Sequence, residues 1–101
     1  MNPQQMLQQA RKLQAQLAKV QEELGQESVA GTAASGAVVV TLDGHGTVLS
    51  VKLNKDAVDP NDVETLEDLI LLAIKDAQAK ARELSQARLG PLAGGLSMPG
   101  F

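Results

Sequence analysis

Two segments of helical length flank a series of short alternating segments, and this order limits what the chain can fold into. From Asn2 to Gly25, apolar residues recur at alternating steps of four and three, which is typical of an amphipathic helix with a coiled-coil-like seam. The seam residues are Met6, Ala10, Leu13, Leu17, Val20 and Leu24. Asn2 followed by Pro3 predicts the start of this helix, and Gly25 predicts its end.

Three strands are predicted between the helices. Residues 38–43 and 47–54 alternate along the chain with the period of half-buried strands, and residues 27–34 hold small and branched side chains that predict a first, edge strand. Ser35-Gly36 and Asp43–Gly46 indicate tight turns. Strands joined by such short turns must be antiparallel, because a parallel pair needs a long crossover. We therefore expect a short antiparallel three-stranded sheet.

A second helix is predicted from Asn61 to Leu89. The segment Asp59–Asp62 offers an acidic cap, a proline for the first turn and further acid that favours a helix N-terminus. Its main apolar seam contains Val63, Leu66, Ile70, Ala73 and Ala77. Gly90-Pro91 is expected to end the helix. The predicted fold class is α+β with the chain order α-β-β-β-α: one helix–sheet–helix domain over residues 1–90, then a flexible Gly/Pro-rich tail over residues 91–101.

The predicted helices are too long for the predicted sheet, which indicates a two-fold homodimer. Helices of about 22 and 28 residues span roughly 33 and 42 Å, whereas a strand of about seven residues spans about 23 Å. The apolar seams continue into the overhang, and exposed apolar strips of this kind are rare in soluble monomers. A second copy would cover them; the alternative is a monomer whose two helices cover each other. The residues expected at the dimer interface are Leu13, Leu17, Leu71 and Leu72.

The composition argues against an enzyme. The chain has no cysteine, one aromatic residue (Phe101) and one histidine (His45), which excludes thiol chemistry, the usual zinc sites and aromatic stacking on bases. His45 lies in a glycine-flanked turn, where a solvated side chain is expected. No spacing suggests a nucleophile beside a base, and we expect no cofactor and no small-molecule substrate. The longest apolar run, Leu69–Ile74, is too short to span a membrane, so we expect a cytoplasmic protein.

Charge is distributed unevenly along the chain. Residues 1–20 contain three basic residues and no acid, residues 21–76 contain eleven acids against three lysines, and residues 77–101 contain three basic residues against one acid. The net charge of −3 therefore conceals two basic ends and an acidic middle. Basic helix ends are candidates for contacts with DNA phosphates, and an ordinary solvated surface is the alternative. The candidate residues are Arg11, Lys12, Lys19, Lys80, Arg82 and Arg88.

The whole chain resembles the YbaB/EbfC family of bacterial nucleoid-associated proteins. The resemblance is carried by the order of Val20–Leu24, Val38–Thr41, Val48–Leu53, Asp56–Asp62, Val63–Ile70, Asp76-Ala77 and Gly94–Phe101. It implies a tweezer-shaped homodimer that binds double-stranded DNA through projecting helices at the nucleoid, with roles in chromosome organisation and gene regulation. It implies a link to recombination and replication proteins by association only. A protein–protein adaptor for such a factor, which would use the acidic middle and the C-terminal tail, is the alternative hypothesis.

Overall fold

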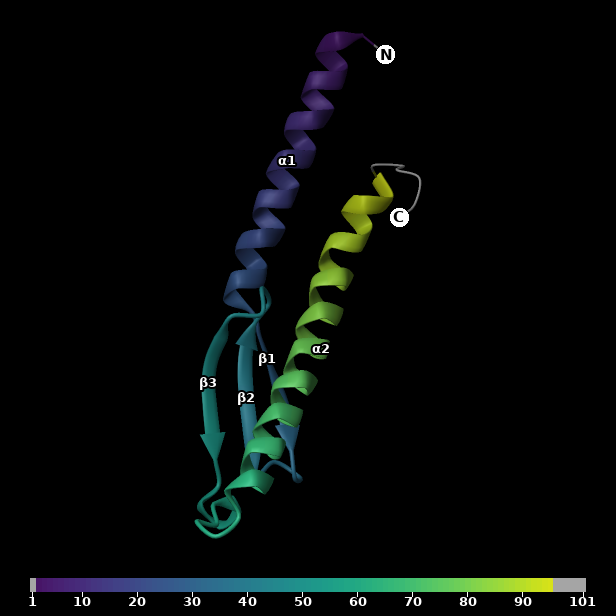
Figure 1. The fold of residues 1–101 in the computed structure, drawn as a ribbon. Helices are drawn as coiled ribbons and strands as arrows, with labels where there is room; N and C mark the ends of the chain where they lie inside the picture. Colours follow the sequence, from purple (N-terminus) through teal and green to yellow (C-terminus); the bar gives the residue numbers. More distant parts are fainter. Residues whose placement is uncertain (1, 96–101) are drawn as a thin grey trace.

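Two long helices flank a three-stranded sheet in the computed structural model, which describes residues 2–95 (Figure 1). The elements are α1 (Pro3–Gln26), β1 (Ser28–Ala33), β2 (Val38–Asp43), β3 (Val48–Leu53), the 3-10 helix η1 (Lys55–Ala57) and α2 (Val63–Gly95). The predicted chain order α-β-β-β-α is confirmed, and every strand lies within one residue of its predicted bounds.

The first helix, α1, begins as the sequence predicts but ends later. The side-chain oxygen of Asn2 accepts a hydrogen bond from the amide of Gln5 at 2.8 Å, which caps the helix N-terminus. The prediction that Gly25 ends the helix is wrong, because α1 continues past it and Glu27 is the C-terminal cap. Gly25 does not adopt the positive φ of a glycine cap, since the chain passes from the helix directly into the extended backbone of β1.

The sheet has the strand order β1-β2-β3, and both strand pairs are antiparallel as predicted. Between β2 and β3, Thr41 pairs with Ser50 whereas Leu42 pairs with Val48, which leaves Leu49 as the extra residue of a β-bulge. Because β2 lies in the middle, β1 and β3 form the two edges of the sheet.

The second helix, α2, begins later than predicted because its N-terminal signature divides into two parts. The carboxylate of Asp59 accepts a hydrogen bond from the Asn61 amide at 2.9 Å, so Pro60 lies in a turn and not in the first helical turn. The carboxylate of Asp62 accepts hydrogen bonds from the amide of Thr65 at 3.3 Å and from its hydroxyl at 2.7 Å. Asp62 is therefore the N-terminal cap of α2.

The prediction that Gly90-Pro91 ends the second helix is also wrong, because α2 continues through Pro91 to Gly95. A proline has no N–H, so the carbonyl of Ala87, four residues earlier, lacks its usual helical donor. Ala87 and Pro91 are both exposed, and water therefore solvates that carbonyl at little cost. Of the predicted tail, residues 96–101 lie outside the described part of the chain.

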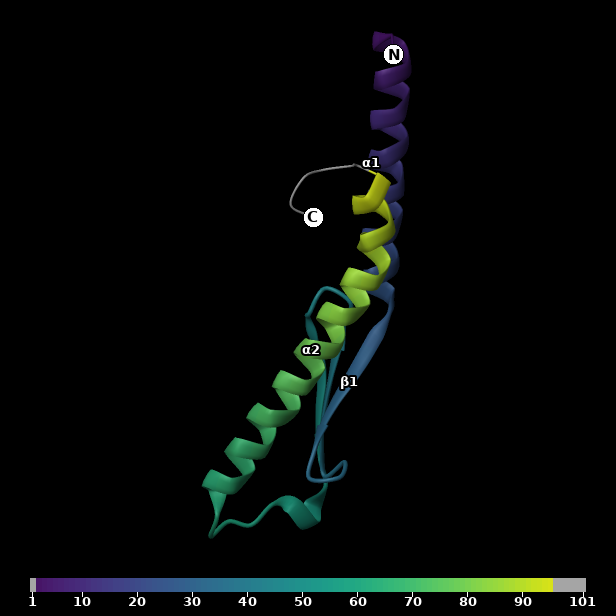
Figure 2. The same cartoon turned by 90° about the vertical axis from the view of Figure 1, so that its right-hand side faces the viewer.

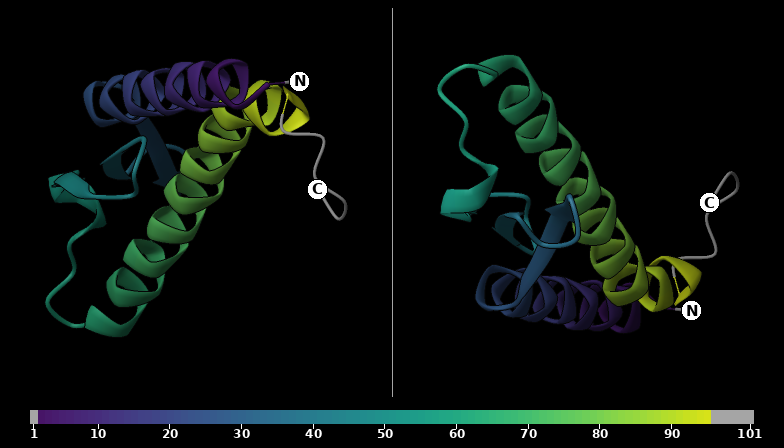
Figure 3. Two further views of the ribbon diagram at one scale, coloured as in Figure 1. Left: turned by 90° about the horizontal axis from the view of Figure 1, so that it is seen from above. Right: turned by 90° about the horizontal axis from the view of Figure 1, so that it is seen from below.

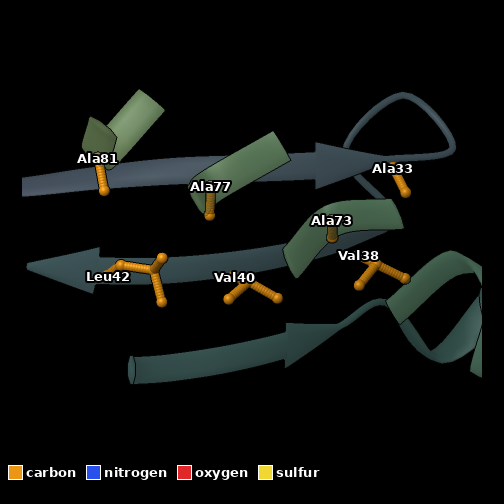
Figure 4. Close-up of a cluster of buried hydrophobic side chains, with 7 residues drawn as sticks. All are labelled: Ala33, Val38, Val40, Leu42, Ala73, Ala77 and Ala81. Atoms are coloured by element: carbon orange, nitrogen blue, oxygen red, sulfur yellow. The ribbon is translucent and has the colours of Figure 1, made fainter. Parts of the chain in front are cut away.

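The hydrophobic core lies between α2 and one face of β1 and β2 (Figure 4). Its buried side chains are Ala33, Val38, Val40, Leu42, Ala73, Ala77 and Ala81. At Gly31 of β1, the helix approaches so closely that a Cβ atom would lie 2.2 Å from the carbonyl oxygen of Ala73 and from the amide nitrogen of Ala77. The small residues on both elements therefore let α2 lie directly against the backbone of β1.

Both helices extend beyond the sheet at the same end of the molecule, and α1 reaches further than α2 (Figures 1 and 2). The molecule is elongated, with principal extents of 70 × 26 × 16 Å. Seen along the length of the molecule, the two helix axes lie at an angle to each other and come together toward the projecting end (Figure 3). Along α1 the seam becomes more buried toward the sheet, from Met6, which is 58% exposed, through half-buried Leu13 and Leu17 to buried Leu24. The overhanging apolar seam that the sequence predicts is therefore present in the single chain.

Candidate functional site

Three of the predicted DNA-binding residues lie on α1, which projects from the sheet (Figure 1). Arg11, Lys12 and Lys19 are exposed, and α1 carries no acidic residue before Glu22. Within residues 2–95, none of these three side chains forms an ion pair. The projecting part of α1 therefore presents positive charge that no carboxylate of the described chain neutralises.

The three predicted residues on α2 have different surroundings. Arg82 is exposed, lines a cavity beside the β2–β3 turn and makes no ion pair with any described residue. Lys80 lies with its Nζ 3.2 Å from Asp76 Oδ2, and the same Nζ donates to the carbonyl oxygen of Ala30 at 3.0 Å. Arg88 is half-buried and paired with acids of the α1 end. Lys80 and Arg88 are thus engaged within the chain, whereas Arg82 is not.

Asp76 and Lys80 together cover the outer edge of β1. The amide of Thr32 donates to Asp76 Oδ2 at 3.0 Å, while the carbonyl of Ala30 accepts from Lys80. These two backbone groups belong to the edge of β1 that does not pair with β2, where a strand from another chain would otherwise bind. Two backbone groups of the β1 edge are therefore already bound within the chain, which disfavours pairing with a further strand there.

The carboxyl of Asp76 gives this edge a defined dependence on pH. The Thr32 amide, and then Lys80, hold the pKa of Asp76 below its ordinary value of 3.8. A lowered folded-state pKa stabilises the fold above pH 3.8, and this contribution disappears as the pH falls through the lowered pKa. Asp76→Asn is therefore expected to reduce the free energy of unfolding at neutral pH, by an amount that shrinks on acidification.

Urea unfolding at neutral pH and at about pH 3 measures this difference, with Asp68→Asn on an exposed position of α2 as the matched control. Asp68 takes part in no hydrogen bond or ion pair of the described structure, so its substitution tests the loss of one carboxylate alone. An Asp76→Asn effect of the same size at both pH values would contradict the assignment.

Arg88 joins α2 to the C-terminal end of α1. Its Nη1 lies 3.4 Å from Glu23 Oε2, and its Nη2 pairs with the carboxylate of Glu27. The second carboxylate oxygen, Glu27 Oε2, is buried and has no hydrogen-bond partner among the described residues. A half-buried arginine between two glutamates fixes the relative position of the two helices, which is a structural role and leaves little of its charge for a ligand.

The β2–β3 turn also contacts the C-terminal end of α1. The amide of Gly44 donates to the carbonyl oxygen of Leu24 at 2.8 Å, and a Cβ on this glycine would lie 2.4 Å from that oxygen. His45 is exposed as expected, but its Nε2 lies 2.7 Å from the carbonyl oxygen of Gln21. Sequence reasoning missed this contact, for which the only signal was a histidine between two glycines.

The predicted interface residues of α2 lie on two different sides of the helix. Leu72 precedes Asp76 and Lys80 by four and eight residues, so it lies on the side that faces the β1 edge. Leu71 precedes Gln78, which lines the cavity by the β2–β3 turn, by two helical turns, so it lies toward β3. Both leucines are about half exposed, at 50% for Leu71 and 56% for Leu72.

The edge strand β3 presents an apolar surface that α2 does not cover. Val48, Val51 and Leu53, named here the β3 strip, pair directly with the buried β2 residues Leu42, Val40 and Val38. Directly paired residues lie on the same face of a sheet, so the β3 strip continues the face against which α2 packs. All three strip residues are at least 40% exposed.

Residues 2–95 contain no group of three His, Cys, Asp or Glu side chains that could hold a metal ion. Among the helices in this part of the chain, none is both long enough and apolar enough to cross a membrane. Three features of the described chain remain as candidates for a functional site: the charged surface of α1, Arg82 with its cavity, and the β3 strip.

Comparisons with known proteins identify relatives of this chain and a solved structure with the same fold. The family model described as the YbaB/EbfC DNA-binding family matches residues 1–96. A nucleoid-associated protein of Roseiflexus sp. is 54% identical over 101 residues, which cover 100% of both chains. A nucleoid-associated protein of Chloroflexus aggregans is 50% identical over 96 residues, which cover 95% of this chain and 96% of that protein. The crystal structure of an uncharacterized protein from Helicobacter pylori has the same fold, with a TM-score of 0.75, 14% identity and coverage of 96% of this chain and 99% of that chain.

Proposed function

Because this chain belongs to the YbaB/EbfC DNA-binding family, we propose that it is a nucleoid-associated protein that binds duplex DNA as a homodimer. The observation that carries the proposal is the projecting α1, whose Arg11, Lys12 and Lys19 are exposed and without an acidic partner among residues 2–95. Arg82 adds a fourth exposed cation, on α2. Basic side chains of this kind bind phosphates of any sequence, which supports binding with little sequence preference.

Lys80 and Arg88 contribute less to this proposed DNA surface than the sequence suggests. Each is held by carboxylates of its own chain, so a phosphate would have to compete with an existing ion pair. We therefore assign DNA contact to Arg11, Lys12, Lys19 and Arg82, and assign Lys80 and Arg88 to the β1 edge and the helix junction.

The dimer is proposed to form through β3. Asp76 and Lys80 already bind backbone groups of the β1 edge, whereas β3 is an edge strand that carries the exposed β3 strip, and Leu71 lies on the side of α2 toward it. A second copy that pairs with β3 would satisfy the free edge and cover this strip in one interface. Leu13 and Leu17 on the α1 seam extend the apolar surface that a second copy could cover.

Gel-shift titration of duplex DNA, on a sample whose mass is known from sedimentation, tests both parts of the proposal. We expect a mass of twice the 10.6 kDa chain, because one chain leaves the β3 strip uncovered. If two copies bring eight free cations to the duplex, affinity should fall roughly 10,000-fold between about 50 and 200 mM salt. A stable single subunit at high dilution would contradict the dimer, and salt-independent binding would contradict the phosphate contacts.

Roles in chromosome organisation and gene regulation are part of this proposal, since a protein that binds many sequences alike coats DNA more readily than it marks one site. The alternative, an adaptor for a recombination or replication factor without direct DNA contact, predicts no gel shift. The family match favours the DNA role, because the matched family is a DNA-binding family.

A further inference from the structure

A cavity of about 460 Å³ lies where the β2–β3 turn meets the middle of α2. The turn contributes Gly44, His45 and Gly46, and the helix contributes Gln78, Ala81, Arg82 and Ser85. The turn also contacts the C-terminal end of α1 through the hydrogen bond from Gly44 to Leu24. The cavity therefore lies near the junction from which the two helices extend.

The polar side chains of the cavity suit an anion. Arg82, Gln78 and Ser85 carry hydrogen-bond donors, and Arg82 also carries a positive charge. No carboxylate is among the lining residues. Residues 78, 82 and 85 recur at steps of four and three, so their side chains project from one side of α2. An arginine among neutral donors is the arrangement that binds phosphate oxygens.

The β2–β3 turn forms a wall of the cavity, but its backbone amides are not free to donate hydrogen bonds into the cavity. The amide of Gly44 is bound to Leu24, that of His45 to Asp43 Oδ1 at 2.9 Å, and that of Gly46 to Asp43 O at 3.0 Å. His45 Nε2 faces the carbonyl oxygen of Gln21, which only accepts, so this nitrogen carries its proton there. Recognition in the cavity therefore depends on the side chains of α2.

We propose that this cavity is a phosphate-binding pocket in which Arg82, Gln78 and Ser85 donate to the oxygens of one phosphate group. The inference deepens the proposed function, because Arg82 belongs to both. The phosphate belongs either to the backbone of bound DNA or to a free phosphate or nucleotide, since the same donors recognise both. A backbone phosphate held here would place the duplex against the base of the helices as well as against the α1 tip.

Chemical shifts of backbone amides in the ¹⁵N-labelled full chain test the pocket, with sodium phosphate and a short DNA duplex titrated separately at constant ionic strength. With at least one of the two probes, the amides of Gly44–Gly46 and those around Gln78–Ser85 are expected to show chemical-shift changes that saturate. Gln78→Glu keeps the shape of the side chain but places a carboxylate in the pocket, and should weaken binding of the responding probe about tenfold or more. Asn61→Asp, on an exposed position before α2 and outside the cavity, adds the same charge and should change binding less than about twofold.

The two probes separate the sources of the phosphate. Pocket shifts with DNA alone support a backbone phosphate, and shifts with inorganic phosphate alone support a free ligand. If neither probe shifts the pocket amides, or if Gln78→Glu and Asn61→Asp weaken binding equally, the pocket assignment is wrong. DNA that binds the protein without shifting these amides would overturn the pocket and leave the proposed function intact, whereas absence of DNA binding in the parallel gel shift would overturn the function itself.

Discussion

Replacing Gly31 with alanine is expected to lower the free energy of unfolding by about 3 kcal/mol or more. The added Cβ would lie 2.2 Å from backbone atoms of Ala73 and Ala77, and backbone cannot rotate away as a side chain can. The helix would have to lift from β1, which would open the contacts that Val40 and Ala77 make in the core. For a domain of this size, such a loss is a large part of the total stability.

Urea unfolding followed by far-UV circular dichroism measures this effect, with all variants at one protein concentration because an oligomer's stability depends on it. Gly90→Ala is the matched control, because Gly90 lies inside α2 and a Cβ added there would meet no neighbouring side chain or strand within 4 Å. This control should change the free energy of unfolding by less than about 1 kcal/mol, because the higher helix propensity of alanine is opposed by the restriction that Pro91 places on the residue before it. A Gly31→Ala variant as stable as the natural chain would show that α2 does not lie directly on β1.

Replacing Arg11, Lys12 and Arg82 together with alanine is expected to weaken DNA binding about 100-fold or more at low salt, and equally on all sequences. These side chains are exposed and unpaired within the described chain, so their loss removes phosphate contacts without disturbing the core. If all three contact phosphates in both copies of a dimer, the slope of log affinity against log salt should become less steep by about five.

A second triple variant controls for net charge in this experiment. Lys52, Lys55 and Lys75 are also exposed, and their replacement with alanine removes the same charge from the acidic middle of the chain. We expect this variant to retain affinity within about threefold, because only long-range attraction changes. Equal losses in the two triple variants would indicate binding through net charge alone, and unchanged affinity in the first would refute the residue assignment.

The elements of the fold were predictable because each has a periodicity that arises from local geometry. The heptad-like seam of α1 and the alternation along β2 both indicate which side of the element is buried. In β2, Val38, Val40 and Leu42 are buried as the alternation predicts. The ends of the helices were less predictable. Gly25 and Pro91 are of types that frequently terminate helices, yet their effect depends on their surroundings: an extended strand begins soon after Gly25, and solvent reaches the carbonyl that Pro91 leaves without a donor.

The candidate site was predictable only in part, because contacts between distant segments cannot be counted along the sequence. The pair of Asp76 and Lys80 follows from their spacing of four on a helix. The contacts of Lys80 with the Ala30 carbonyl and of Arg88 with Glu23 do not, because these partners are 50 and 65 residues away along the chain and become neighbours only when α2 packs across the sheet. The cavity beside Arg82 was not predictable for the same reason, since the β2–β3 turn meets α2 only in the folded chain.

Asp76 and Lys80, which bind the backbone of the β1 edge, also bear on whether copies of this protein could associate through their sheets without limit. Open-ended stacking of sheets into fibres needs a free strand on both sides of every unit. Here two backbone groups of the β1 edge are already bound, so the dimer proposed to form through β3 would offer no second free strand to a third copy. If the proposed dimer forms, we expect it to remain a discrete pair.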